Sequence, residues 1–474
     1  MHFFNPQEVS QWAVGQWRGS LREKISGFTN DTRALKPGDC FVALKTGVRD
    51  GHDFLNNAAA SGATAALVEQ VNPEVDLPQL EVKDSWKAIR RIANGYRNSF
   101  QGSVIGITGS CGKTSTKDLL QRLLGQGETH ATHGNLNNLL GVPLTLLGIQ
   151  PERHTRAVIE AGLNTPGEMN ALAKTIQPDS AIVTLIAPVH TGFLGDVESI
   201  AGHKAKLCEA AKIDGRCFMP VSCLQFNAFQ SLNKKLHVLI PEGNPIPSVS
   251  GAVTPYFYRV SREARGPRIE LTLIGPDQVK RSFLFRRVSA GMAQNVALAV
   301  LAASSEGVSD GLIQERLEGW VASQWRGEVF RDATTYYYVD CYNASPPAMC
   351  DAFGIFDELF PQAMRRSYVL GSMGELGNEA PHLHHRVGAS LPLRPQDRVF
   401  LYGQHVEHIR AGLIDSGVAP EAIMIAQTRE ELAKALKHVG GAVLLKASKV
   451  YEFWKLLPSE ATRIPYQALE PLLC

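Results

Sequence analysis

The stretch GITGSCGKTSTKD, residues 106–118, decides how the middle of this chain folds. The apolar run SVI (103–105) before it is typical of a strand, and the amphipathic LLQRLLG (119–125) after it is typical of a helix. Glycines in such a turn let backbone N–H groups face phosphate oxygens, and the positive end of the helix points to the same place. The pattern GxxGxxGKT is similar to the GxxxxGK[ST] phosphate-binding loop. A glycine-rich turn without a ligand is the alternative.

The turn therefore predicts a site for the phosphates of ATP or GTP. In such loops the lysine, here Lys113, reaches the β- and γ-phosphates, and the hydroxyl of the next residue, Thr114, holds Mg²⁺. The nucleotide-binding residues expected from the loop are Gly109, Ser110, Cys111, Gly112, Lys113, Thr114 and Ser115. The loop alone does not indicate which reaction the nucleotide drives.

The bulk composition is that of an ordinary globular protein with more than one domain. The chain has 474 residues, which is too many for a single hydrophobic core and predicts two to four domains. A net charge of +2 gives no reason to expect nucleic acid or an anionic membrane as a partner. Eight scattered cysteines without CxxC spacing are typical of reduced thiols. No signal peptide or bilayer-long apolar run is visible, so we expect a cytoplasmic protein.

The order of apolar and amphipathic segments predicts an α/β fold with three domains. We expect a small N-terminal α/β module (1–98), a central P-loop ATPase-like domain with a mostly parallel sheet (99–318), and a C-terminal Rossmann-like, doubly wound domain (319–474). The segments RIELTLIG and SFLFRRV (268–275 and 282–288) predict a hairpin appended to the central sheet. The Pro- and Gly-rich stretch at 241–255 is typical of a surface loop.

Three further residues lie where a metal or phosphate could be bound. Glu160 ends the predicted strand RAVIE, and His190 follows the strand SAIVTLI, so both lie at carboxyl ends of strands. Lys206 lies in the helical segment HKAKLCEAAK. A solvated acid, a satisfied histidine and a surface lysine are the ordinary interpretations, and spacing alone does not exclude them.

Seven ordered motifs and an N-terminal segment resemble the Mur ligase family over most of the chain. They are GITGSCGKTSTKD, HGNLNNLLGVPLTLL (133–147), EAGLNTPGEM (160–169), HTGFLGDVESIAGHKAKLCEA (190–210), RGEV (326–329), DCYNASPPAM (340–349), GSMGELG (371–377) and DTRALKPGDCFVALKTGVRDGHDF (31–54). This resemblance implies a ligase that joins a carboxylate to an amine through an acyl phosphate at the expense of ATP. The motifs are most similar to those of members that join D-alanyl-D-alanine to a UDP-N-acetylmuramoyl tripeptide in peptidoglycan precursor synthesis.

The resemblance also implies roles for individual residues. Lys113, His190, Lys206 and Arg326 would form the catalytic set, with Arg326 reaching the γ-phosphate. Two Mg²⁺ ions would be held by Thr114, Glu160, His190 and Lys206, the last as a CO₂-derived carbamate. Asn295 would face the adenine and Asp340 the ribose. The substrate-binding residues implied are Thr32, Arg33, Asn137, Asn138, Asn343 and Ser345.

Three positions depart from the residues common in the family. Gly291 stands where SAGMAQN would usually carry a histidine, Ser372 replaces an aspartate, and Lys449 replaces an arginine. An Arg-to-Lys change keeps the charge and loses a bidentate fork. Two alternatives therefore remain: a family member that adds a different amino acid, although the DNPR motif of the diaminopimelate-adding relative is absent, and an inactive nucleotide-binding paralogue. Folylpolyglutamate synthase is a remoter relative that the uridine-nucleotide-like module argues against. We expect a monomer.

Overall fold

The computed structural model describes residues 3–21, 24–189, 191–247, 252–262, 266–360, 364–437 and 439–469. Its contacts divide the chain into two compact units. The first unit comprises Met1–Thr108, Leu124–Ile182 and Lys206–Cys217, and the second comprises Gly109–Leu123, Val183–Ala205 and Phe218–Cys474. The strands form three sheets, most of whose pairings are parallel, so the predicted α/β class is confirmed. The strands of each sheet fall within one of the three predicted domain ranges, whose exact boundaries remain predictions.

The N-terminal sheet has the strand order β1-β5-β4-β3-β2. Strands β2 to β5 are parallel, and β1 is antiparallel to β5. The strands are β1 Gln16–Arg18, β2 Gly27–Thr29, β3 Asp39–Val42, β4 Ala65–Val68 and β5 Gln79–Glu81, and the helices are α1 Pro6–Ala13, α2 Leu55–Ala60 and α3 Ser85–Ser99. Strand β4 is buried along its whole length, as expected for a parallel strand covered on both faces.

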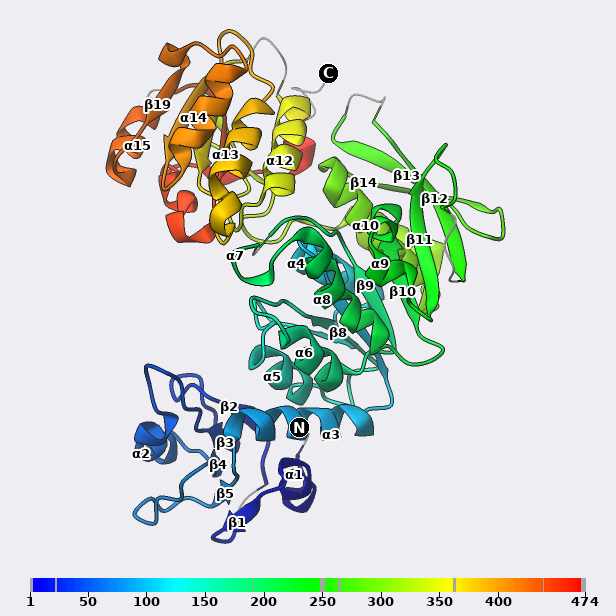
Figure 1. Cartoon of the computed structure of the whole chain (residues 1–474), viewed down its shortest axis with the longest axis vertical. Helices are drawn as coiled ribbons and strands as arrows, with labels where there is room; N and C mark the ends of the chain where they lie inside the picture. The colour runs from blue at the N-terminus through cyan, green and yellow to red at the C-terminus, as the bar shows by residue number, and fades with distance from the viewer. Residues whose placement is uncertain are drawn as a thin grey trace. The chain divides into compact units, whose positions relative to one another are not determined.

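Helix α3 anchors the N-terminal region within the first unit. The Asp84 side chain caps the helix by accepting a hydrogen bond from the Lys87 N–H at 2.8 Å. At the other end, Arg97 is buried and forms an ion pair with Asp179 at 2.7 Å, and the Tyr96 hydroxyl donates to a backbone carbonyl at 2.7 Å. Figure 1 shows α3 beside α5 and α6.

The central sheet has nine strands in the order β14-β13-β12-β11-β10-β9-β6-β8-β7. Its strands are β6 Ser103–Thr108, β7 Thr129–Ala131, β8 Arg156–Glu160, β9 Ser180–Val183, β10 Arg216–Pro220, β11 Lys235–Pro241, β12 Val253–Ser261, β13 Arg268–Ile274 and β14 Lys280–Arg286. Its helices are α4 Lys113–Leu124, α5 Gly141–Leu147, α6 Glu168–Ile176, α7 Thr191–Leu194, α8 Val197–Glu209, α9 Asn227–Gln230, α10 Ala290–Ser305 and α11 Asp310–Glu318.

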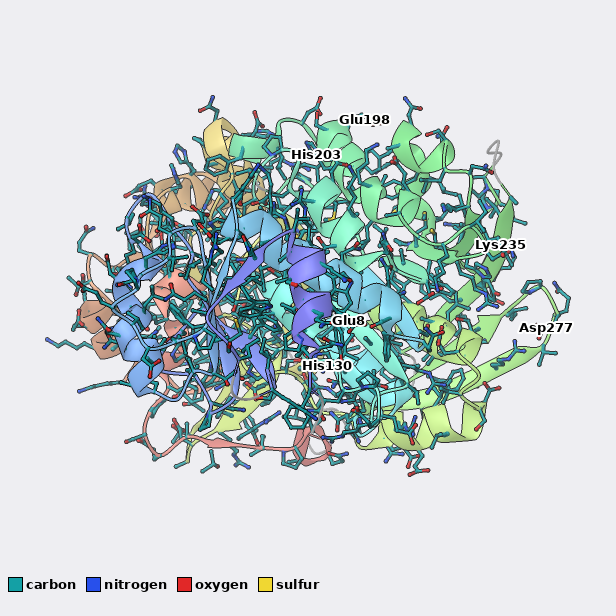
Figure 2. All side chains as sticks on the ribbon, turned by 90° about the horizontal axis from the view of Figure 1, so that it is seen from below. Glu8, His130, Glu198, His203, Lys235 and Asp277 are labelled. Carbon is teal, nitrogen blue, oxygen red and sulfur yellow. The ribbon has the colours of Figure 1, made fainter. Side chains whose placement is uncertain are left out.

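The predicted hairpin is confirmed as β13 and β14, which pair antiparallel. Figure 2 shows Asp277 at the tip of this hairpin. The predicted loop at 241–255 is shorter than expected, because β12 already begins at Val253 and pairs in parallel with β11. Helix α10 is apolar on nearly all sides and is buried from Val296 to Ala303.

The C-terminal sheet has the order β19-β18-β17-β20-β16-β15-β21. The five strands from β19 to β16 are parallel, and β15 is antiparallel to both of its neighbours. Its strands are β15 Glu328–Arg331, β16 Thr335–Val339, β17 Arg366–Gly371, β18 Arg398–Tyr402, β19 Ile423–Ile425, β20 Gly441–Lys446 and β21 Thr462–Arg463, and its helices are α12 Pro346–Leu359, α13 Ala380–Ala389, α14 Val406–Asp415 and α15 Arg429–Leu436. Helices α13 and α14 lie side by side (Figure 1).

No helix in the described part of the chain combines the length and the hydropathy needed to span a bilayer.

Candidate active site

The glycine-rich turn lies between strand β6, which ends at Thr108, and helix α4, which begins at Lys113. Gly109 and Gly112 both have positive φ angles, +147° and +82°. A methyl group added at Gly109 would lie 2.0 Å from Thr184 Oγ1, and one added at Gly112 would lie 2.3 Å from Asn295 Nδ2. Backbone conformation and close neighbours thus both require glycine at these two positions. The strand–turn–helix arrangement predicted from the sequence is confirmed.

Residues after β9 hold the turn in place. The Thr184 hydroxyl donates to the Cys111 carbonyl at 2.5 Å, and the Ser110 N–H donates to the Leu185 carbonyl at 2.7 Å. The Ser110 hydroxyl donates to the Ala187 carbonyl at 2.9 Å and accepts from the Ala187 N–H at 3.0 Å. Because its own polar groups are used in this way, Ser110 orders the loop backbone.

Two lysines converge on one backbone oxygen of the turn. Lys113 Nζ and Lys204 Nζ each donate to the Gly109 carbonyl at 2.9 Å. Lys204, on α8, is only 1% exposed. Burial lowers its pKa well below the ordinary value of lysine, and the nearby charge of Lys113 lowers it further. The two amines therefore place positive charge, or nitrogen donors, where a phosphate would lie.

The structure does not place Lys206 with these two lysines. Its ammonium pairs with Glu209 one turn later on α8, at 2.8 Å, and its side chain is 41% exposed. Residues two apart on a helix project about 200° from each other, so only one of Lys204 and Lys206 can face the turn. Lys204 is the buried lysine of this helix, and the metal-site role of Lys206 stays a prediction. Figure 2 labels two other α8 residues, Glu198 and His203.

Glu160 is a buried carboxylate at the end of β8. It is 1% exposed, and its Oε1 accepts a hydrogen bond from Asn137 Nδ2 at 2.7 Å. Asn137 thus orients the Glu160 carboxylate. The sequence analysis did not predict this contact, because it arises only from the tertiary structure. The carboxylate of Glu160 and the hydroxyl of Thr114, in the first turn of α4, are hard oxygen donors of the kind Mg²⁺ prefers.

The predicted ligand His190 lies outside the described residues. Within the described ranges, no group of three or more His, Cys, Asp or Glu side chains forms a metal-binding cluster.

Asp340 and Arg326 lie beside further charged and aromatic groups at the edge of the C-terminal sheet. Asp340 Oδ2 accepts from Lys446 Nζ at 2.7 Å, and Lys446, which is buried, also donates to the Asn343 carbonyl at 2.9 Å. The Arg326 guanidinium lies 4.0 Å from the ring centre of Tyr342, and the Lys449 ammonium lies 5.2 Å from the same ring. Lys446 and Tyr342 were missed by the sequence analysis, because no motif spacing links them to the nucleotide loop.

The other predicted substrate residues have mainly local contacts. The exposed Arg33 guanidinium pairs with Asp31 at 2.7 Å and, by this hydrogen bond, lowers the Asp31 pKa to about 2. Thr32 lies in the same turn. Asn138 Oδ1 accepts from the Gly141 N–H at 2.9 Å at the start of α5. Near the start of α12, Asn343 Oδ1 accepts from the Ala344 N–H at 2.9 Å, and Ser345, the buried residue before the helix, makes no side-chain capping hydrogen bond.

Three models of Mur ligase domains match this chain. The model described as the Mur ligase family catalytic domain matches residues 24–97, the Mur ligase middle domain matches 107–240, and the model described as Mur ligase, glutamate ligase domain, matches 325–449.

Curated relatives and solved structures agree with these matches. The UDP-N-acetylmuramoyl-tripeptide–D-alanyl-D-alanine ligase of Bacillus subtilis is 30% identical over 90% of this chain and 91% of its own length. The enzyme of the same name from Escherichia coli is 32% identical over 80% of this chain and 82% of its own. A crystal structure of MurF from Acinetobacter baumannii superimposes with a TM-score of 0.83 at 26% identity, covering 96% and 98% of the two chains.

A likeness in fold alone extends to the MurF ligase of Thermotoga maritima solved with ADP, with a TM-score of 0.76 at 24% identity over 94% and 97% of the two chains. The order of the domains, the glycine-requiring turn and the full-length likeness lead to one conclusion: this chain belongs to the Mur ligase family.

Proposed function

We propose that this protein is an ATP-dependent ligase that joins D-alanyl-D-alanine to a UDP-N-acetylmuramoyl tripeptide during peptidoglycan precursor synthesis. The observation that carries the proposal is the pair of lysine amines on the Gly109 carbonyl, in a turn where backbone and neighbours both require glycine. The names of the curated relatives, which match this chain over 80–90% of its length, support the choice of substrates.

The reaction follows from charge. A peptide carboxylate attacks the γ-phosphate, so two anions must approach each other before the acyl phosphate forms and ADP leaves. Lys113 and Lys204 lie on the side of the phosphate-binding turn, and Arg326 would meet the γ-phosphate from the C-terminal region. The free amine of the dipeptide then attacks the acyl carbon and inorganic phosphate departs. The protein mainly supplies position and positive charge.

Among the described residues, Thr114, Glu160 and Lys206, the last as a carbamate, would each offer an oxygen ligand to Mg²⁺. When bound, Mg²⁺ supplies further neutralisation of the phosphate oxygens. Asn137 fixes the orientation of the Glu160 carboxylate, so it acts on the metal through that acid.

The carbamate is proposed on Lys206, as the resemblance to the family implies. A lysine must lose its proton before its nitrogen can attack CO₂. The addition forms an N–C bond, releases one proton and converts a cation into a carboxylate-like oxygen donor. The Lys206 side chain is 41% exposed and therefore accessible to CO₂. Substitution of Lys206 by alanine should abolish activity, with partial rescue by short carboxylic acids, and full activity in that variant would remove Lys206 from the metal site.

A substrate screen tests the function directly. Phosphate release would be measured with ATP, UDP-N-acetylmuramoyl tripeptides that differ in the third residue, and a panel of amines that includes D-alanyl-D-alanine, D-glutamate and diaminopimelate. We expect release only with the dipeptide. Release with a single amino acid would identify a different family member, and nucleotide binding without release under any combination would identify an inactive paralogue.

We expect the protein to act in the cytoplasm, where its nucleotide substrates are made, and to be a monomer. Size-exclusion chromatography with light scattering tests the second expectation, and a mass of two chains would contradict it.

A further inference from the structure

A side chain at Gly291, in the first turn of helix α10, would meet the carboxylate of Asp351. A methyl group added there would lie 2.9 Å from Oδ2 of Asp351 and 3.2 Å from its Cγ. Both are parts of one carboxylate that belongs to helix α12, about sixty residues later in the chain. The Asp351 carboxylate therefore occupies the space next to position 291, where a histidine is common in the family.

The Asp351 carboxylate binds the start of α10. Its Oδ1 accepts a hydrogen bond from the Gly291 N–H at 2.8 Å, and the Ser289 side chain also hydrogen-bonds to it. The first N–H groups of a helix have no partner within the helix, and negative charge is favourable at that end. Ser289 already caps the Met292 N–H. Asp351 and Ser289 therefore satisfy successive N–H groups at the start of α10.

This end of α10 leads directly to the nucleotide turn. Asn295 lies four residues after Gly291, so both lie on one face of the helix. Asn295 is buried, and its amide lies against Gly112 of the turn, where an added methyl would be 2.3 Å from Nδ2. The first turn of α10 thus sets how the Asn295 side chain meets the glycine-rich turn.

A second carboxylate on the same face of helix α12 also forms contacts outside this helix. Glu358, seven residues after Asp351, pairs with Arg262 at 2.6 Å and with Arg287 at 3.2 Å. Two carboxylates two turns apart therefore bind elements around the central sheet, but only Asp351 reaches α10. Glu358 offers a matched control on the same helix.

We propose that Asp351 is a positioning residue for the nucleotide, and that Gly291 and Asp351 work as one unit. The Asp351 carboxylate fixes the position of the first turn of α10. Asn295, one turn later on this helix, is thereby held against the glycine-rich turn and beside the nucleotide base. Neither residue can be changed alone without loss, whereas a side chain at 291 becomes acceptable once the carboxylate is removed. The expected effect on catalysis rests on the proposed function, but the effect on nucleotide binding does not.

Four variants test this inference: Asp351→Ala, Asp351→Asn, Gly291→His and the double variant Gly291→His/Asp351→Ala. Affinity for ADP would be measured by calorimetry without any amine substrate, with KM for ATP and kcat measured separately. Asp351→Ala should weaken ADP binding about fivefold, the factor for one ordinary hydrogen bond, and raise KM for ATP more than it lowers kcat. Asp351→Asn keeps an oxygen acceptor and should restore most of the affinity.

Gly291→His should weaken ADP binding more than tenfold, while the double variant should come back to within about threefold of the native protein. The control Glu358→Gln should lower the melting temperature and leave ADP affinity unchanged. Native affinity in Asp351→Ala, or a loss in the double variant equal to the product of the two single losses, would overturn the proposal. If Gly291→His does not fold, the two Asp351 variants and the control still decide it.

Discussion

Replacing Lys204 by methionine should separate catalysis from stability. The substitution keeps an unbranched side chain, one atom shorter, and removes the amine of a residue that is 1% exposed and donates to the Gly109 carbonyl. Loss of one preorganised group at the phosphates typically lowers kcat by about 10²–10³. The Gly109 carbonyl keeps its hydrogen bond from Lys113, so no backbone acceptor is left without a donor. We therefore expect a large loss of phosphate release in a protein that is at least as stable as the native one.

The pH dependence of stability gives a sharper form of this prediction. Burial lowers the pKa of Lys204 in the folded protein, so between that pKa and the ordinary lysine value the unfolded chain binds more protons. The free energy of unfolding of the native protein then rises with pH in this window, by up to about 1.4 kcal/mol per pH unit from this group. Lys204→Met lacks that contribution, so its stability relative to the native protein should be greatest at the low-pH end of this window and should decline as the pH rises through it.

Lys206→Met is the matched control. Its ammonium forms an exposed ion pair with Glu209, which contributes roughly 0–1 kcal/mol, so the free energy of unfolding should stay close to native at every pH. Urea unfolding at several pH values and phosphate-release kinetics measure both variants. Native phosphate release by Lys204→Met would refute its role at the phosphates, and a stability difference between Lys204→Met and native that does not change with pH would refute the lowered pKa.

Three further outcomes are expected. Gly112→Ala should weaken ADP binding strongly in calorimetry, because the new methyl would meet Asn295 at 2.3 Å in a backbone with φ +82°; native affinity would contradict this. Asp340→Ala leaves the buried Lys446 without its carboxylate partner and should lower the free energy of unfolding by about 1–3 kcal/mol in urea titrations, an effect that a Lys446→Met/Asp340→Ala double variant should largely remove. Chelation of divalent cations should stop phosphate release, and added Mg²⁺ should restore it; activity that persists in chelator would exclude the metal.

The sequence predicts the strand–turn–helix of the phosphate loop well, because glycine, lysine and threonine at fixed spacing have direct backbone consequences. It also predicts the α/β class, since the alternation of apolar and amphipathic segments follows from local periodicity. The ends of individual strands are predicted less well. Strand β12 begins inside a stretch whose Pro and Gly content predicts a loop, because pairing with β11 outweighs the local sequence preference.

Which of Lys204 and Lys206 is buried against the turn could not be predicted from the sequence. Both lie in the same helical segment, and only the packing of α8 on the turn decides which one faces inward. The same holds for Asn137, whose role depends on a hydrogen bond to Glu160 across 23 residues, and for Lys446, which reaches Asp340 from a strand about a hundred residues away. Contacts of this kind arise from tertiary structure and leave no local pattern.

The shared carbonyl oxygen of Gly109 has a consequence for anions in general. Each of these two amines donates to the same neutral acceptor and carries further N–H groups, so any small oxyanion that enters the turn can accept more than one hydrogen bond. Inorganic pyrophosphate and sulfate should therefore raise the melting temperature of the free protein in proportion to their charge, and should compete with ATP in the same order. Adenosine, which carries no phosphate, should do neither.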